Sequence, residues 1–110
     1  MHLPNAESAI VDERKVRGYL LNRSHPDGAY KAAYFEGYGF SAEEWMVFAA
    51  ALQKHAHTSE LVDVSESLYG TRYVVEGKLQ TDCGKHPRIK SVWIIEKTGG
   101  LPRLITAYPA

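Results

Sequence analysis

Five side chains of this 110-residue chain could carry out acid–base chemistry on a phosphodiester. Cleaving RNA without a metal needs a base for the 2′-hydroxyl, an acid for the leaving oxygen, and cations around the phosphorane. Histidine can take the first role, tyrosine the second, and lysine and arginine the third. The candidate catalytic set is therefore two residues before the expected sheet and three on its last strand: His25, Lys31, Arg103, Thr106 and Tyr108.

Each of these residues also has a plain structural interpretation. His25 precedes a proline and can simply shape a loop, Lys31 can be a solvated helix charge, and Arg103 can pair across a hairpin. Thr106 and Tyr108 favour strands and can simply pack. The residues alone leave both interpretations open.

Other kinds of site are not indicated. His55 and His57 lie two apart on an expected helix, hence on different faces, and only His86 is near the single Cys83, so no zinc spacing appears. The chain has no glycine-rich phosphate loop and no nucleophile elbow. We therefore expect neither a metal nor a cofactor.

Charge is unevenly distributed although the net charge is zero. Residues 1–70 carry six lysines and arginines against ten acids, and residues 71–110 carry seven against three. A basic half of this kind can attract phosphate, although chance scatter of solvated charges is the alternative. Candidate binding residues in this half are Arg72, Lys85, Arg88 and, for a protein partner, Trp93.

Length and composition describe one ordinary globular domain over residues 1–110, with 45% hydrophobic and 24% charged residues. No apolar run approaches a membrane span, and no signal peptide opens the chain. A single cysteine suits a reducing compartment. These features predict a cytoplasmic protein without a membrane partner.

Helices are expected in the first half of the chain. Asp12 resembles an N-cap, followed by a buried stripe to about residue 22, and a short helix covers 30–36. Ser41-Ala-Glu-Glu44 is a capping box, with Phe40 and Trp45 spaced as a hydrophobic staple. This third helix should end near two histidines, which would complement the helix dipole when charged.

The second half predicts strands. Residues 58–70 look like a loop, and alternating segments follow at 71–80, 88–97 and 101–109. On the last strand, Thr106 and Tyr108 should share a face with Leu104. We therefore predict an α+β fold with three N-terminal helices packed on a small antiparallel sheet of three to four strands.

Many positions resemble a small bacterial and archaeal family of unknown function. They run in order along nearly the whole chain: Leu3-Pro-Asn-Ala-Glu7, Ile10-Val-Asp12, Lys15, Tyr19-Leu-Leu-Asn22, His25-Pro26, Gly28, Lys31-Ala32, Gly39-Phe40, Tyr69-Gly70, Tyr73, Val92-Trp93 and Pro102-Arg-Leu-Ile-Thr106. Members of that family stand alone or form the C-terminal module of toxin-like proteins, often encoded beside a second small family. The resemblance implies a toxin–antitoxin pair with a small antitoxin encoded nearby.

The order of elements is also similar to the fold of barnase, EndoU, colicin E5 and RelE toxins, which are metal-independent ribonucleases. That similarity implies RNA as a partner, with His25 as general base or acid and Lys31 and Arg103 as phosphate ligands. Thr106 and Tyr108 would be positioning or proton-relay groups. This chain departs from such toxins in being neutral, where they are often basic.

Two hypotheses therefore stand side by side. The first is a small metal-independent endoribonuclease toxin. The second is a non-catalytic protein–protein module, such as an antitoxin, an immunity-like partner or a subunit, that uses the sheet face bearing Trp93 and Tyr108. Convergence of His25, Lys31, Arg103 and Tyr108 in one concave site would favour the enzyme.

Overall fold

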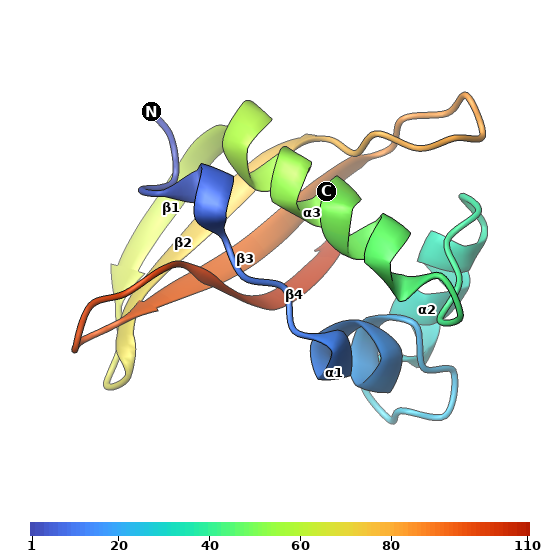
Figure 1. The fold of residues 1–110 in the computed structure, drawn as a ribbon, viewed down its shortest axis with the longest axis horizontal. Helices are drawn as coiled ribbons and strands as arrows, with labels where there is room; N and C mark the ends of the chain where they lie inside the picture. The colour runs from blue at the N-terminus through green and yellow to red at the C-terminus, as the bar shows by residue number, and fades with distance from the viewer.

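The chain folds as an α+β domain whose helical half precedes a four-stranded antiparallel sheet (Figure 1). The structure, a computed structural model, describes residues 1–110. The helical segments are η1 (Ala6–Ser8), α1 (Glu13–Lys15), a π-helical turn η2 (Val16–Leu20), α2 (Ala29–Glu36) and α3 (Trp45–Thr58). The strands are β1 (Glu60–Glu66), β2 (Gly70–Lys78), β3 (Arg88–Glu96) and β4 (Arg103–Pro109).

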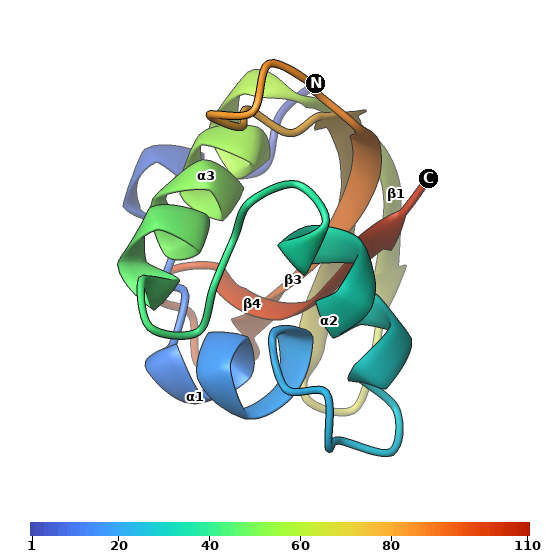
Figure 2. The same cartoon turned by 90° about the vertical axis from the view of Figure 1, so that its right-hand side faces the viewer.

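The sheet is a meander in the order β1-β2-β3-β4. Helix α3 packs on one face of it against β2 and β3, whereas α1 contacts β4. Helix α2 lies beside β4 in Figure 2, and from there Lys31 reaches the Thr106 side chain. Ile10 adds a single parallel bridge to Arg103 at the β4 edge.

The predicted loop at residues 58–70 is wrong, because β1 occupies most of it. β1 pairs with β2 from Glu60 opposite Glu76 to Glu66 opposite Thr71. Six of its seven residues are exposed. An edge strand that buries so few side chains does not need alternating apolar residues, so its sequence carried no strand pattern. Its backbone pairing, and not side-chain burial, defines it.

Helix α3 is the best predicted element. Its apolar face is buried, with Phe48 and Leu52 at 0% exposure, and the buried Phe40 ring lies 4.6 Å from the Phe48 ring. The backbone N–H of Glu44 donates to Ser41 Oγ at 3.2 Å, the contact expected of the capping box, but it closes the turn before the helix, whose N-cap is Glu44 and not Ser41. The regular helix then begins at Trp45.

Ser41→Ala should lower the free energy of unfolding by about 1 kcal/mol, the usual loss when a side-chain oxygen that accepts a backbone N–H at the start of a helix is removed. Urea denaturation is the measurement. Ser65→Ala, on the exposed β1 strand and without a capping contact, is the matched control. An unchanged midpoint for Ser41→Ala would show that its hydroxyl does not stabilise α3.

His55 does not sit at the helix end as a charge, contrary to expectation. It is 1% exposed, Nδ1 lies 2.8 Å from Ser91 Oγ, and Nε2 lies 3.1 Å from the Gly77 carbonyl oxygen. Burial lowers the pKa of His55, and the hydrogen bond to Gly77 offsets this only in part. The ring is therefore neutral, with Nε2–H donating to Gly77 and Nδ1 accepting from Ser91.

Strand β4 contains a β-bulge that the sequence did not predict. Trp93 is paired with Leu104, yet the preceding Val92 is paired with Thr106. Ile105 is therefore an extra residue in β4. Beyond it, the side chains that simple alternation would place on one face of the sheet lie on the other face.

The change of phase corrects the predicted faces of β4. Ala107, paired with Ser91, is fully buried, and Leu104 is only 2% exposed. Thr106 and Tyr108 pair with residues of the opposite parity on β3 and so share a face with each other but not with Leu104. The prediction that all three share one face is wrong.

Trp93 belongs to the core. It is 0% exposed, and its Nε1–H donates to Ser91 Oγ at 2.8 Å, extending the contact of Ser91 with His55. Tyr108 lies on the other face of the sheet, because its β3 partner is Lys90. Trp93 therefore offers no surface to a partner, and the interface predicted to bear Trp93 and Tyr108 does not exist as one face.

Candidate functional site

Three polar side chains from three separate elements meet between the helices and β4. Lys31 Nζ, from α2, donates to the Tyr19 hydroxyl of η2 and to Thr106 Oγ1 of β4, the latter at 3.1 Å. The Tyr19 hydroxyl and Thr106 Oγ1 are also 3.1 Å apart. A closed triangle of amine, phenol and hydroxyl results.

Local sequence explains how each member reaches this point. Val16 and Leu20 anchor η2 in the core at 0% exposure, which leaves the Tyr19 ring half-buried beside them. Lys31 is 8% exposed on the buried side of α2. A Cβ at Gly28 would collide with the Tyr19 carbonyl and ring, so a glycine lets α2 start close against Tyr19.

His25 stands next to this triangle. Its ring meets the Tyr19 ring edge-on, with 4.9 Å between centroids. His25 Nδ1 accepts the backbone N–H groups of Asp27 and Gly28 at 3.0 and 3.1 Å. Nδ1 is therefore unprotonated, and the remaining nitrogen, Nε2, carries the hydrogen and can donate it.

These groups border an open hollow of about 370 Å³, lined by Lys15, Tyr19, His25, Asp27, Ile105 and Thr106. The bulge residue Ile105 and its neighbour Thr106 both reach it, which is how β4 presents a hydroxyl here. Lys15 Nζ lies 5.7 Å from the centre of the Tyr19 ring. The hollow therefore combines a phenol, an imidazole and an amine.

Tyr19 has a perturbed acidity. Burial raises the pKa of its phenol, but hydrogen bonds from Lys31 and Thr106 and the charges of Lys31 and Lys15 lower it by more. The net shift is downward from 10.0. A phenol of this kind ionises more readily than an ordinary tyrosine and can accept a proton as a general base.

The structure brings together only part of the predicted catalytic set. His25, Lys31 and Thr106 converge, whereas Arg103 Nη1 is held by the Asp12 carboxylate at 2.8 Å. Asp12 is the N-cap residue of α1, as predicted, but its side chain makes no capping hydrogen bond. Tyr108 does not line the hollow, but it follows Thr106 on the same face of β4, about 7 Å along the strand.

Of the predicted binding residues, none lines this hollow. Arg72 is exposed on β2, Lys85 is exposed in the loop before β3, and Arg88 is paired with Glu76 at 2.9 Å. Tyr19 and Lys15 were missed as site residues. Tyr19 lies within the stripe that is predicted to be buried up to about residue 22, and a phenol in such a stripe usually brings its hydroxyl to a polar partner.

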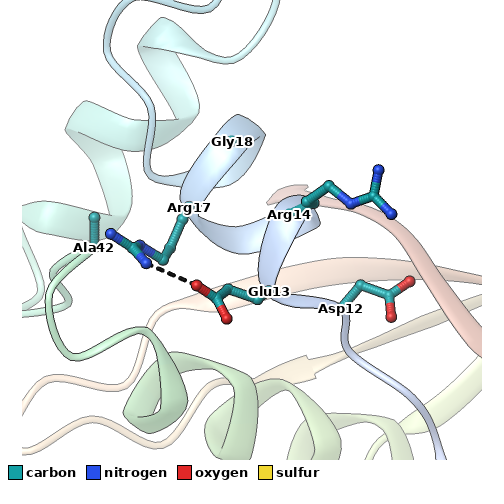
Figure 3. Close-up of a pocket in the computed structure, with 6 residues that line it drawn as sticks. All are labelled: Asp12, Glu13, Arg14, Arg17, Gly18 and Ala42. Atoms are coloured by element: carbon teal, nitrogen blue, oxygen red, sulfur yellow. Dashed lines mark hydrogen bonds and ion pairs between the residues drawn. The ribbon is translucent and has the colours of Figure 1, made fainter.

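The largest hollow of the molecule, about 540 Å³, lies beside this site and is not the site itself (Figure 3). It is lined by Asp12, Glu13, Arg14, Arg17, Gly18 and Ala42. Figure 3 shows Arg17 reaching Glu13, with 2.7 Å between Nη1 and Oε2, while Arg14 extends from the other side of the helix. This hollow is polar and open, with no acid–base pair of its own.

Nowhere do three histidine, cysteine or carboxylate side chains come together in an arrangement that could hold a metal ion. None of the helices has both the length and the apolar character needed to cross a bilayer.

Comparison with known proteins relates the whole chain to others. It is similar to a chain of the contact-dependent growth inhibition toxin–immunity protein complex from Klebsiella pneumoniae 342, at 19% identity and a TM-score of 0.70, over 97% of each chain. That likeness shows a shared fold. No curated protein matches the sequence. The model of a domain of unknown function, DUF6883, matches residues 2–110, so the chain belongs to the DUF6883 family.

Proposed function

We propose that this protein is a toxin-like endoribonuclease that cleaves RNA without a metal. The observation that carries the proposal is the triangle of Lys31, Tyr19 and Thr106, which opens with His25 onto one hollow. It supplies a phenol of lowered pKa and an imidazole whose ring meets the phenol ring edge-on, with 4.9 Å between centroids. The fold shared with a chain of a toxin–immunity complex supports a role of this class.

The chemistry is attack of a ribose 2′-hydroxyl on its own phosphodiester. The ionised Tyr19 oxygen takes the 2′-hydroxyl proton, the 2′-oxygen bonds to phosphorus, and the bond to the 5′-oxygen breaks. The products are a 2′,3′-cyclic phosphate and a 5′-hydroxyl. Tyr108 supplies the proton to the 5′-oxygen, and exchange with water restores both phenols.

The other side chains stabilise this step. His25 Nε2–H donates to a non-bridging phosphoryl oxygen, and Lys15 places a positive charge on the hollow. Lys31 is buried behind Tyr19, so its role is to hold the phenol oxygen in its ionised form. The resemblance implied that Lys31 and Arg103 bind phosphate; in this mechanism Lys15 takes that place.

Purified protein incubated with total RNA in EDTA tests the proposal. We expect fragments ending in 2′,3′-cyclic phosphate, a rate that falls as salt rises, and growth arrest on expression without a cognate antitoxin. His25→Asn keeps an acceptor near the Nδ1 position but lacks the Nε2 donor, and it should cleave more slowly. Tyr69→Phe, at an exposed tyrosine outside the hollow, is the control. Intact RNA with wild-type protein would overturn the proposal.

An immunity-like role is the second candidate, because the similar chain comes from a complex of toxin and immunity protein. The observation in its favour is a group of exposed apolar side chains at the end of the sheet where the β1–β2 turn lies beside the β3–β4 loop: Val64, Leu68, Tyr69 and Leu101. Such a surface suits a protein partner. Protection of a cell from a neighbouring toxin, with no RNA cleavage, would favour this role.

A further inference from the structure

Three separate hollows on the surface lie next to one another along α1 and η2, and each shares two lining residues with the next. The largest, about 540 Å³, shares Asp12 and Arg14 with a second of about 270 Å³. The second shares Lys15 and Tyr19 with the site hollow of about 370 Å³. We call this row of adjoining hollows the α1 groove; it extends from Arg17 to Tyr19.

Ion pairing leaves the α1 groove with unpaired cations. Its two carboxylates at the start of α1 are both occupied, Glu13 by Arg17 at 2.7 Å and Asp12 by Arg103 at 2.8 Å. Arg14 and Lys15 form no ion pair, and Arg14 is exposed. The remaining acid, Asp27, lies at the far end beside His25. The unpaired positive charges of Arg14 and Lys15 therefore lie in the middle of the groove.

We propose that the α1 groove binds the RNA strand flanking the scissile bond, with Arg14 contacting a phosphate beyond the one in the catalytic hollow. This inference rests on the proposed function, since the hollow at the end of the groove is the proposed active site. From Asp12 to Tyr19 the helical axis rises by roughly 10 Å, which extends the contact past a single phosphodiester.

The occupant is a single strand and not a mononucleotide. The hollows are open to solvent, and the unpaired cations Arg14 and Lys15 can contact successive phosphates of a flexible strand. Contacts to phosphate position a strand without reading its bases. The groove should therefore favour longer substrates while adding little sequence preference.

Binding is tested without cleavage, using a fluorescent 2′-O-methyl decamer that lacks the attacking hydroxyl. Arg14→Gln should weaken binding roughly threefold to tenfold and should lower the slope of log K against log salt by about 0.7, the loss of one phosphate contact. Arg23→Gln is the matched control, because Arg23 is exposed, outside the groove and paired with Glu36. An unchanged salt slope for Arg14→Gln, or equal weakening by Arg23→Gln, would overturn the inference.

Cleavage of substrates of different length separates this inference from the proposed function. Arg14→Gln should cleave a dinucleotide as fast as wild type and should lose kcat/KM only on a decamer with 2′-hydroxyls. Equal loss on both substrates would show that Arg14 acts at the catalytic hollow and would overturn the groove. If wild-type protein binds the decamer through Arg14 but cleaves neither substrate, the groove stands and the ribonuclease does not.

Discussion

Tyr19→Phe is expected to reduce the rate of RNA cleavage by about 10²–10⁴-fold, the usual contribution of a general base. The substitution removes only the hydroxyl that Lys31 and Thr106 contact. The ring that meets His25 edge-on stays in place, so the fold should survive. Initial rates on a labelled RNA, together with circular dichroism of the variant, make the measurement.

The pH dependence distinguishes a base from a structural tyrosine. Cleavage should accelerate as pH rises through the pKa of Tyr19, which lies below 10.0 because of Lys31, Thr106 and Lys15. Lys31→Met removes the nearest positive charge, raises the pKa of the phenol, and should move the rising limb to higher pH. A folded Tyr19→Phe that cleaves at the wild-type rate, or an unmoved limb in Lys31→Met, would contradict the role of Tyr19.

Trp93→Ala is expected to lower the free energy of unfolding by roughly 3–5 kcal/mol, the range for truncating a large buried aromatic. Trp93 is 0% exposed, so the change empties the centre of the core. It also removes the indole N–H, which donates to Ser91 Oγ. Ser91 Oγ in turn is hydrogen-bonded to His55 Nδ1. Soluble yield and urea denaturation measure the loss.

Two further variants keep this prediction testable if Trp93→Ala does not fold. Trp93→Phe retains an aromatic ring and should be less destabilising, although it leaves a smaller cavity and one lost hydrogen bond. Trp45→Ala truncates a half-buried tryptophan at the start of α3 and should cost less than Trp93→Ala. A cooperatively folding Trp93→Ala of near-native stability would show that the indole adds little to the core.

Local patterns predicted the elements whose signals are local. The hydrogen bond from Glu44 to Ser41 Oγ, the limits of α2 and the alternation of β2 and β3 depend on neighbours a few residues away, and the structure contains all three. These features needed no knowledge of which strand lies beside which helix.

What the sequence did not predict depends on contacts between distant segments. β1 carries charges at Glu60, Asp63 and Glu66 and forms because β2 is there to pair with it. The bulge at Ile105 is visible only as a mismatch between two strands. Tyr19 looked like a core residue because nothing local shows that Lys31 and β4 will meet its hydroxyl.

The span of the site has a consequence for how folding proceeds. Thr106 is separated from Tyr19 by 87 residues and from Lys31 by 75, so the triangle closes one of the longest loops in the chain. Closing such a loop costs entropy, and non-local contacts of this kind form slowly. Because synthesis proceeds from the N-terminus, the helices emerge well before β4. A nascent chain therefore carries its phenol and amine without the strand that completes them, and the candidate site is assembled only when the sheet closes.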